Sequence, residues 1–573
     1  MNILQTIITG SLLTLTIQAA AQTSPAAGYK TISNGNPISS NVFCADPTAL
    51  EYNGRLYVYG SNDSQQFVAS GKKNKNTYGA IKTIAVFSTD DMVNWTFHGT
   101  IDTNKLCANW NNNPWYKGYG VSWAPSVTWR TTADGTDEFF LYFCNSSHGV
   151  GVLKAKSPIG PWTSPNKQLM IHYNTAGANP QNTNANFDPG VVIDENGVGW
   201  IAFGGLGPSG IMPNAARIVK LKPSMTQVDG SAVKIPAPYH FEANELNVIG
   251  GKFVYTYCSN WSRDQNAWNN YLKQQGINVA MPNTGTMCYM VTDNPTDPNS
   301  WVYKGSYGPH PGTSENNHSH LQKFQGTYYH IYHSGALLKA MKNANPAGCD
   351  NSCELYRSIC INKATVNEST QKISTVSLDN KGVAAIKNLD PYQQQEAETM
   401  ATSGGVNYED FTNTKSVTTI NGNKNDASEN LQIKMRAGAW TMVRVADFGA
   451  EGARSFTVRV RGKGKMELRT ARNGKALASV SFDDKAWKEY TVSVAPTVFK
   501  GVFNYLFFSF PEADSSTYFD WWQFSSEDAT GVKAVTRQRA ADGQTYDLSG
   551  RKVEKATKKK GIYIQNGKKV TIK

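Results

Sequence analysis

Between residues 40 and 385 the chain alternates short apolar runs rich in Tyr and Phe with turns marked by Gly or Asn-Gly, and helical periodicity is almost absent. Each unit opens on a polar or aromatic residue, continues as an apolar run, turns and returns as an aromatic strand. Asn-Gly between apolar runs is a strong hairpin signal. The openers lie 77, 65, 54 and 76 residues apart: Asp46, Trp123, Asp188, Glu242 and His318.

Five such units indicate a five-bladed β-propeller, because a unit of about four strands cannot bury both of its faces alone. In several units a further run ends in Trp after a polar turn, at Trp95, Trp162 and Trp301. The innermost strands of a propeller line a central channel, which would bring the openers together in one funnel. A pair of β-sandwiches is the competing architecture, but it does not explain why polar residues open the strands.

A second unit follows a connector at residues 377–391. Its runs alternate apolar and polar residues, as at 455–461, and its span of about 390–526 fits one β-sandwich. The expected fold class is therefore all-β, with a propeller at 28–386, a sandwich at 390–526 and a tail at 527–573. The tail holds two short hairpin patterns, the second with a type I′ turn signal at Asn566-Gly567.

The N-terminus predicts export. Residues 6–21 form a short apolar stretch that ends in Ala19-Ala20-Ala21, so residues 1–21 are expected to be a signal peptide. The first five residues lack Lys and Arg, and a buried first strand is the alternative. No later segment has the roughly 20 apolar residues of a membrane-spanning helix. We expect a periplasmic, cell-surface or secreted protein without a transmembrane segment.

The eight cysteines are widely scattered and form no zinc pattern. Cys349 and Cys353 are the only close pair, and a local disulfide between them is an option that export would allow.

The charge distribution argues against a nucleic-acid partner for the main body. The formal charge is +12, but residues 533–573 hold 12 basic against 3 acidic residues, +9, which leaves 44 against 41, +3, for the remainder. Gripping a phosphate backbone requires basic groups on the binding surface. A nearly neutral body with 11% aromatic residues fits a neutral polysaccharide. Nucleic-acid binding by the tail alone remains an alternative.

Three of the openers are carboxylates, namely Asp46, Asp188 and Glu242. Glycoside hydrolysis needs one protonated carboxyl to supply the leaving group's proton and one ionised carboxyl to activate water or attack the sugar. A third charge nearby can raise the acid's pKa. Each residue alone could start a turn or cap a strand, but three at one place in the repeat favour catalysis. Glu245 is the rival acid, which strand alternation would direct to the opposite face from Glu242.

Residues 36–385 resemble glycoside hydrolase family 43, a five-bladed propeller family. The matching segments are Ala45-Asp46-Pro47, Ser122-Trp123-Ala124-Pro125, Phe187-Asp188-Pro189-Gly190, Phe241-Glu242-Ala243 and Asn317-His318-Ser319. The resemblance implies that Asp46 is the general base, Glu242 the general acid and Asp188 the residue that tunes the acid's pKa. It also implies inversion, with two carboxyls roughly 6.5–9.5 Å apart. Many members carry Glu-Gly-Pro at the acid; Glu-Ala-Asn here is similar to the arabinofuranosidase branches.

The resemblance assigns further pocket residues. His318, rather than His320, matches a histidine beside a central calcium that is mostly coordinated by water. Arg357 matches a late arginine whose planar donor fork suits sugar hydroxyls or a carboxylate, and Trp123 matches an aromatic residue that stacks on sugars. Trp115 and Phe43 are additional candidates for the pocket wall. The alternatives are a packing histidine, a surface arginine and a tryptophan that only packs the blade.

Residues 390–526 resemble carbohydrate-binding module family 6. The matches are Glu396-Ala397-Glu398, Ala439-Trp440, Trp487 and the segment from Phe519 to Phe524. The resemblance implies a structural calcium near Glu396, Glu398 and Asp520, since calcium prefers oxygen ligands, and a sugar-stacking pair of Trp487 and Tyr408. No catalytic cofactor is expected.

The tail resembles the C-terminal sorting tails of secreted proteins in Bacteroidetes-type bacteria, which implies secretion machinery or surface attachment as a partner. A small accessory β-unit is the alternative. For the whole chain we expect an exported glycosidase that removes α-L-arabinofuranosyl or β-D-xylosyl units from plant hemicellulose such as arabinoxylan or arabinan. A non-catalytic carbohydrate-binding propeller is the competing hypothesis. The sugar and the linkage depend on loops such as 62–80, 102–118 and 262–285.

Overall fold

The computed structural model describes most of the chain. The described residues are 24–110, 120–178, 185–312, 316–344, 349, 352–412 and 431–529, with four short strands of the tail. The predicted signal peptide at 1–21, the wall candidate Trp115 and the turn at Asn566-Gly567 lie outside the described residues.

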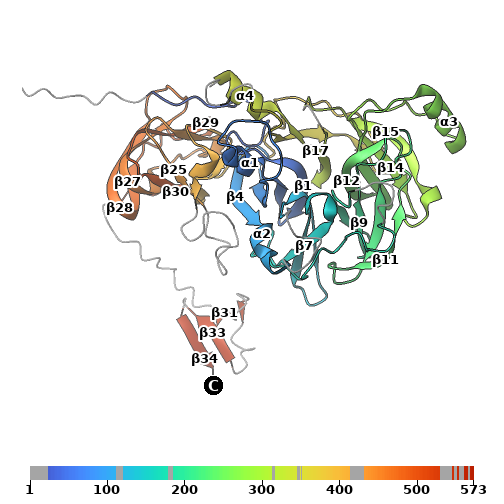
Figure 1. The fold of residues 1–573 in the computed structure, drawn as a ribbon. Helices are drawn as coiled ribbons and strands as arrows, with labels where there is room; N and C mark the ends of the chain where they lie inside the picture. The colour runs from blue at the N-terminus through green and yellow to red at the C-terminus, as the bar shows by residue number, and fades with distance from the viewer. Residues whose placement is uncertain are drawn as a thin grey trace, which may run out of the picture. The chain divides into compact units, whose positions relative to one another are not determined.

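Five antiparallel sheets form the predicted five-bladed propeller (Figure 1). Blade I contains β1 (Ala45–Tyr52), β2 (Arg55–Ser61), β3 (Thr83–Thr89) and β4 (Trp95–Asp102). Blade II contains β5 (Trp123–Thr131), β6 (Asp137–Cys144) and β7 (Val150–Ala155). Blade III contains β8 (Gly190–Ile193), β9 (Gly199–Phe203), β10 (Arg217–Leu221) and β11 (Val228–Lys234). Blade IV contains β12 (His240–Ile249), β13 (Lys252–Ser259), β14 (Met287–Thr292) and β15 (Val302–Gly308). Blade V contains β16 (Ser319–Phe324), β17 (Thr327–Ser334) and β18 (Ser358–Ala364).

The hairpin that starts each blade forms where the turn chemistry predicts it. Both residues of the Asn53-Gly54, Gly250-Gly251 and Gln325-Gly326 turns have positive φ, as a type I′ turn requires. This turn matches the right-handed twist of the flanking strands, which explains why the first two strands of these blades pair directly.

The entry to the first strand is kinked in four blades. Asp46, Ala124, Asp188 and Ala243 have φ values of 49°, 38°, 50° and 64°. In blades I, II and IV the strand register shifts at this kink, so two residues of the first strand face one residue of the second. Asp46 and Asp188 stand on the kink itself, whereas Glu242 stands one residue before it. The expectation that the three carboxylates share one place in the repeat is therefore wrong by one residue for Glu242.

The segment that precedes β1 closes the circle of five blades. Ile38 N donates to Ile359 O at 2.9 Å and Cys44 N donates to Arg357 O at 2.9 Å, so this segment extends blade V alongside β18. The buried side chain of Asn36 pairs with both backbone groups of Ile361. Chain segments more than 300 residues apart thus fix the axis on which the openers meet.

Helices are few and lie in connections between strands. The α-helices are α1 (Asp63–Ala69), α2 (Thr103–Leu106), α3 (Gln265–Gln275) and α4 (Ala336–Ala344). The 3-10 helices are η1 (Ala108–Trp110), η2 (Ser146–His148), η3 (Pro298–Ser300) and η4 (Tyr408–Asp410). A two-stranded hairpin of β19 (Val366–Asn367) and β20 (Lys372–Ile373) follows blade V.

The expected sandwich is one continuous, curled antiparallel sheet, here called the sheet domain (orange in Figure 1). Its strands are β21 (Gln395–Glu396), β23 (Thr402–Gly404), β24 (Phe411–Thr412), β25 (Gln432–Lys434), β26 (Trp440–Asp447), β27 (Ser455–Arg469), β28 (Ala478–Ser493), β29 (Val502–Ala513) and β30 (Tyr518–Ser525). β27 pairs with β30 along its first half and with β29 along its second half. Gly462 lies at this change of partner with φ 94°, and a Cβ there would lie 2.6 Å from Ser516 O.

The propeller and the sheet domain share one hydrophobic core. β22 (Thr399–Met400) pairs with β4 and becomes the fifth strand of blade I. Val58, Phe87 and Phe97 of blade I belong to the same buried cluster as residues of the sheet domain such as Phe411. The segment before residue 36 also binds the sheet domain, where Trp440 Nε1 donates to Ala26 O at 2.9 Å. The segment before β1 therefore binds both the propeller and the sheet domain.

The tail forms a separate compact unit from Asp528. Its sheet has the order β32 (Lys552–Val553), β31 (Thr545–Tyr546), β33 (Gly561–Gln565) and β34 (Lys568–Ile572), which confirms both predicted hairpins.

All eight cysteines are buried, and Cys353 Sγ donates to Lys72 O at 3.2 Å as a thiol, so the disulfide considered between Cys349 and Cys353 does not form in this structure. None of the described helices is long and apolar enough to cross a bilayer.

Candidate active site

A cavity of about 420 Å³ opens where the kinked blade entries meet. It is lined by the three carboxylates Asp46, Asp188 and Glu242 together with Tyr78, Trp123, Ala124, Phe187, Phe241, Trp261, Asn316 and Arg357. The structure thus brings together the three carboxylates, the arginine and the tryptophan that the sequence singled out.

Asp46 is held by one strong donor on each carboxylate oxygen. Arg357 Nη1 donates to Oδ1 at 2.7 Å, and the Ser61 hydroxyl donates to Oδ2 at 2.7 Å. Ala124 N donates to the same Ser61 oxygen at 2.8 Å, which directs the hydroxyl proton toward Asp46. The backbone N–H of Asp46 donates to His333 Nδ1 at 3.1 Å. These contacts come from three different blades and fix the carboxylate in one orientation.

Asp188 and Glu242 are linked across blades III and IV. Ala243 N, next to Glu242, donates to Asp188 Oδ2 at 2.9 Å. Asn244 Nδ2 donates to the Asp188 carbonyl at 2.9 Å. Glu242 Oε1 accepts from Asn316 Nδ2 at 2.7 Å, and its side chain is buried. The two carboxyl groups are therefore buried and line the same cavity.

The protonation states of these groups diverge. Burial alone would raise the pKa of Asp46, but the charge of Arg357 and the rings of His333 and His318 outweigh it, so the pKa lies well below its usual range. Burial and then the charge of Asp188 hold the pKa of Glu242 well above its usual range. Pairs of carboxyls whose environments separate their pKa values serve as acid and base.

Asp188 lies between these extremes. Burial and then the charge of Asp46 raise the pKa of Asp188 to about 7. The backbone donor from Ala243 favours its ionised form. Of the two carboxyls, Glu242 holds its proton more firmly, because its pKa is raised well above its usual range and it accepts no backbone donor of this kind in the described residues.

Glu245 does not line the cavity. The register shift of β12 between Glu242 and Glu245 breaks the simple strand alternation on which the sequence argument relied. Glu245 lies further along the strand, fully buried, with Oε1 3.2 Å from His320 Nδ1. A position outside the cavity, together with a histidine partner, disfavours it as the acid.

Arg357 lines the cavity, and two carboxylates of the protein engage three of its five N–H donors. Its Nε and Nη2 donate to the two oxygens of Asp63 at 3.0 Å, while Nη1 binds Asp46. These contacts fix the orientation of the guanidinium, and a direct contact of Arg357 with sugar hydroxyls stays a prediction.

Trp123 is half-buried in the cavity wall, and its Nε1 donates to Tyr78 O at 3.1 Å. Phe43 is not part of this wall. It packs against Phe67 and Tyr356, with ring centroids 5.0 Å and 5.5 Å away. Its candidacy as a wall residue is therefore wrong.

His318 is buried beside two of the carboxylates, with Nδ1 3.7 Å from Asp46 Oδ1 and 3.9 Å from Asp188 Oδ2. Burial lowers the pKa of His318 to about 4, so the ring is neutral at neutral pH. Its Nε2 is buried and has no hydrogen-bond partner among the described residues.

Several site residues carried no signal in the sequence. Tyr78, Trp261 and Asn316 come from loops, and Asp63 begins a short helix, so none belongs to the repeated pattern. Trp261 is 47% exposed, and its ring lies edge-on to Phe241 with centroids 4.8 Å apart. Trp261 lies in the loop after β13, and this loop does not belong to the repeated pattern, so the repeat does not mark Trp261 as a site residue.

The structure does not bring Trp487 and Tyr408 together. Arg459 and Arg461 lie over the Trp487 ring at 5.0 Å and 5.2 Å. Tyr408 instead faces blade I, where its hydroxyl accepts from Asn62 Nδ2 at 2.8 Å. The sugar-stacking pair expected from the sequence is therefore not formed by these two residues in this structure.

The expected calcium ligands of the sheet domain lie near one another. β21 pairs with β30, and Ala397 N donates to Asp520 O at 2.8 Å, which places Glu396 and Glu398 on either side of this contact. Burial and then the charge of Glu396 raise the pKa of Glu398 well above its usual range. Asp520 forms an ion pair with Arg459.

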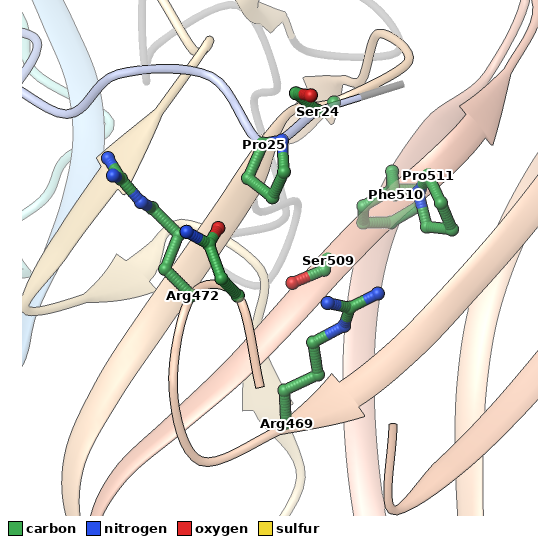
Figure 2. Close-up of a pocket in the computed structure, with 9 residues that line it drawn as sticks. Ser24, Pro25, Arg469, Arg472, Ser509, Phe510 and Pro511 are labelled. Atoms are coloured by element: carbon green, nitrogen blue, oxygen red, sulfur yellow. The ribbon is translucent and has the colours of Figure 1, made fainter. Parts of the chain in front are cut away.

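A second, larger cavity of about 490 Å³ lies in the sheet domain (Figure 2). Its lining includes Arg469, Arg472 and Ser509, with apolar contributions from Phe510 and Pro511. Arg469 is already paired with Glu467. None of the described residues that line this cavity is acidic, so it lacks the carboxyl pair that glycoside hydrolysis requires. The smaller cavity on the propeller axis is the candidate active site.

One carboxyl that stays ionised and another that keeps its proton, on the axis of a five-bladed propeller, are the parts of a glycoside hydrolase. Residues 34–370, which span all five blades, match the model of the glycosyl hydrolases family 43. The chain belongs to this family and is an enzyme that hydrolyses glycosidic bonds.

Two relatives are similar along most of their length. An arabinoxylan arabinofuranohydrolase of Paenibacillus polymyxa is 33% identical over 543 residues, 90% of this chain and 78% of that protein. An arabinoxylan arabinofuranohydrolase of Bacillus subtilis is 34% identical over 525 residues, 87% of this chain and 93% of that protein. The crystal structure of a family 43 arabinoxylan arabinofuranohydrolase from Bacillus subtilis, in complex with cellotetraose, matches with a TM-score of 0.73 and 33% identity, over 88% of this chain and all of that one.

Proposed function

We propose that this enzyme releases α-L-arabinofuranosyl side groups from arabinoxylan with inversion of configuration. The cavity on the propeller axis carries the proposal, because it combines the three carboxylates with an aromatic wall. Aromatic faces suit the apolar C–H faces of sugars. The two relatives named above, which the chain matches over 87–90% of its length, support this substrate.

In this proposal Asp46 is the general base. Its fixed orientation and low pKa keep it ionised, so that Oδ1 or Oδ2 can take a proton from a water molecule as that water attacks the sugar. Glu242 is the general acid, because its raised pKa lets it hold the proton that the leaving oxygen needs. Asp188 maintains that raised pKa through its charge and is tied to the backbone beside Glu242.

Two isosteric substitutions test these roles. Glu242→Gln and Asp46→Asn should each reduce kcat on wheat arabinoxylan and on an aryl α-L-arabinofuranoside by several orders of magnitude. Glu245→Gln, a change of the same type outside the cavity, should retain turnover. Release of arabinose is followed by chromatography, and the anomer first formed is identified by NMR. A Glu242→Gln enzyme that keeps most of its rate would overturn the assignment of the acid.

The same product profile separates the remaining substrates. Release of xylose from xylo-oligosaccharides in place of arabinose would assign the enzyme as a β-xylosidase. Binding of arabinoxylan without any product would indicate a carbohydrate-binding propeller without catalysis.

We also propose structural calcium at two places, as the two family resemblances imply. No three His, Cys, Asp or Glu side chains converge to a metal site within the described residues. An ion near His318 would therefore be held largely through water, and the unpartnered Nε2 of that buried ring fits such a role. In the sheet domain, the buried Glu398 Oε2 also has no partner among the described residues, whereas Asp520 is already paired with Arg459. Calcium there would neutralise the clustered carboxylates and stabilise the fold.

The calcium proposal predicts a lower melting temperature in EGTA than in calcium. Glu398→Gln should shrink this difference, whereas Glu195→Gln on the propeller surface should leave it unchanged. An equal melting temperature in both buffers would refute a structural calcium in the sheet domain.

Export remains part of the proposal. Residues 1–21 would direct secretion, the tail would serve sorting or surface attachment, and the sheet domain would bind the polysaccharide. Fractionation of cells that express the chain with and without residues 528–573 tests the tail. Equal distribution of both chains would leave it as an accessory β-unit.

A further inference from the structure

We propose that Asp63 is a positioning residue that holds Arg357 in place beside the base Asp46. The inference rests on the proposed role of Asp46 and adds a residue to it that no comparison assigns. Asp63 is fully buried at the start of α1 and does not line the cavity. It acts through Arg357 and would not touch the substrate.

Asp63 holds Arg357 along one edge of the guanidinium, and these contacts are called the clamp. Asp63 Oδ2 accepts from the backbone N and from Nε of Arg357 at 3.0 Å each, and Asp63 Oδ1 accepts from Nη2 at 3.0 Å. Nη1, the nitrogen that Asp63 does not engage, donates to Asp46 Oδ1 at 2.7 Å. A planar guanidinium that is gripped along one edge can present its remaining donor in a single direction.

The clamp determines how the base is engaged. Arg357 is the cation between two buried carboxylates. Without Asp63, this buried cation would have Asp46 as its nearest counter-ion, and a bidentate pair with Asp46 would engage both carboxylate oxygens. The Ser61 hydroxyl already binds Oδ2. Asp63 therefore limits Arg357 to one contact with Oδ1 and leaves the base with lone pairs for water.

The guanidinium carbon of Arg357 lies over the ring of Tyr78, 5.0 Å from the ring centroid. Asn62, which precedes Asp63, is itself fixed by Thr83 Oγ1 at 2.9 Å and by Tyr408 of the sheet domain. The clamp is thus anchored on both blade I and the sheet domain, away from the substrate.

A double-mutant cycle on the full chain tests the inference. Asp63→Asn removes the charge but conserves the shape, and its amide N–H₂ would face the Arg357 donors. We expect kcat on an aryl α-L-arabinofuranoside to fall by up to about 100-fold, the scale of a misplaced reacting group, with little change in KM. Arg357→Lys cannot bridge two carboxylates, so in that background Asp63→Asn should cause little further loss of kcat.

Asp91→Asn is the matched control. Asp91 is equally buried in blade I, but its oxygens accept from Val93, Asn94 and Thr89 rather than from Arg357. It should lower the melting temperature while kcat and KM stay as in the parent. If Asp63→Asn fails to fold, Asp63→Ser, which retains one acceptor, enters the same cycle.

Independent effects of Asp63→Asn and Arg357→Lys on kcat would overturn the inference, as would an unchanged kcat in folded Asp63→Asn. A parent enzyme that releases no pentose from any aryl glycoside would instead refute the proposed function, and that measurement comes first.

Discussion

At the scale of single residues, Asp46 and Asp188 combine an unusual backbone with a buried charge. Both adopt left-handed φ values directly before a proline. This conformation costs an L-residue about 1–2 kcal/mol, although Asp tolerates it better than most. The strain is acceptable because the kink turns each carboxylate toward the axis, where donors from neighbouring blades hold it.

The charge of Asp188 should be visible in the pH profile. Glu242 must carry a proton to act as the acid, and the charge of Asp188 raises its pKa second only to burial. Asp188→Asn removes that charge and lowers the pKa of Glu242, so the proton is lost at lower pH. The alkaline limb of kcat/KM should therefore move to lower pH.

Kinetics over the full pH range check this expectation, and Asp194→Asn, in the first turn of the same blade, should not shift the limb. An alkaline limb that stays in place in Asp188→Asn would contradict the role of Asp188.

Trp261 gives a second residue-scale prediction. It is exposed at the cavity mouth and supported edge-on by Phe241. Trp261→Ala should raise KM for arabinoxylan severalfold, since one aromatic contact contributes about 0.5–1.5 kcal/mol beyond its buried area. The effect on a small aryl glycoside should be smaller. Val302→Ala, an exposed apolar residue elsewhere in blade IV, is the control, and equal KM values for Trp261→Ala and the parent would exclude a role in binding.

The sequence predicted the site residues that belong to the repeat. Asp46, Trp123, Asp188 and Glu242 each open a strand, and strand openers converge in a propeller. Asp63 could not be found this way, because its partner Arg357 is 294 residues away and neither stands at an equivalent position in the blades. The same holds for Trp261, whose loop has no counterpart in other units.

At the scale of elements, the approach of β8 to β12 sets the spacing between Asp188 and Glu242. A Cβ on Gly190, the first residue of β8, would lie 2.5 Å from Glu245 Cα and 2.6 Å from Asn244 O. These are backbone atoms, so the two strands would have to separate.

Gly190→Ala should therefore reduce the free energy of unfolding by about 1–3 kcal/mol, as overpacking does. It should also reduce kcat, because Asp188 lies two residues before. Gly335→Ala is the control, since a Cβ there meets no atom within 4 Å and its φ is not left-handed. Urea denaturation measures both variants, and equal stabilities would show that the strands can adjust freely.

Local elements were predictable and distant pairings were not. Each hairpin of the propeller is encoded by the residues of its own turn, as at Asn53-Gly54. β22 is only two residues long, and its partner strand lies about 300 residues earlier, so no periodic pattern announces it. The sequence also gives no sign of the change of partner along β27, because apolar and polar residues continue to alternate through Gly462.

At the scale of the whole molecule, the chain divides after Glu527 rather than between the propeller and the sheet domain. Deletion of 528–573 should therefore leave the melting temperature and kcat unchanged.

A chain that ends at residue 386 should fail to fold stably, because it loses Phe411 and the other sheet-domain residues of the shared core. Calorimetry of both truncations distinguishes the outcomes, and a stable, active chain that ends at 386 would contradict the shared core.

The pairing of β22 with β4 has a consequence for solubility. The outermost strand of a blade presents unpaired N–H and C=O groups, and such an edge is a template for pairing with other chains. In blade I, β22 covers part of this edge with two residues supplied from the sheet domain. Partial detachment of the sheet domain would expose both the edge of β4 and the apolar side chains of blade I. Self-association under mild denaturing conditions should therefore begin at this edge, well before the propeller itself unfolds.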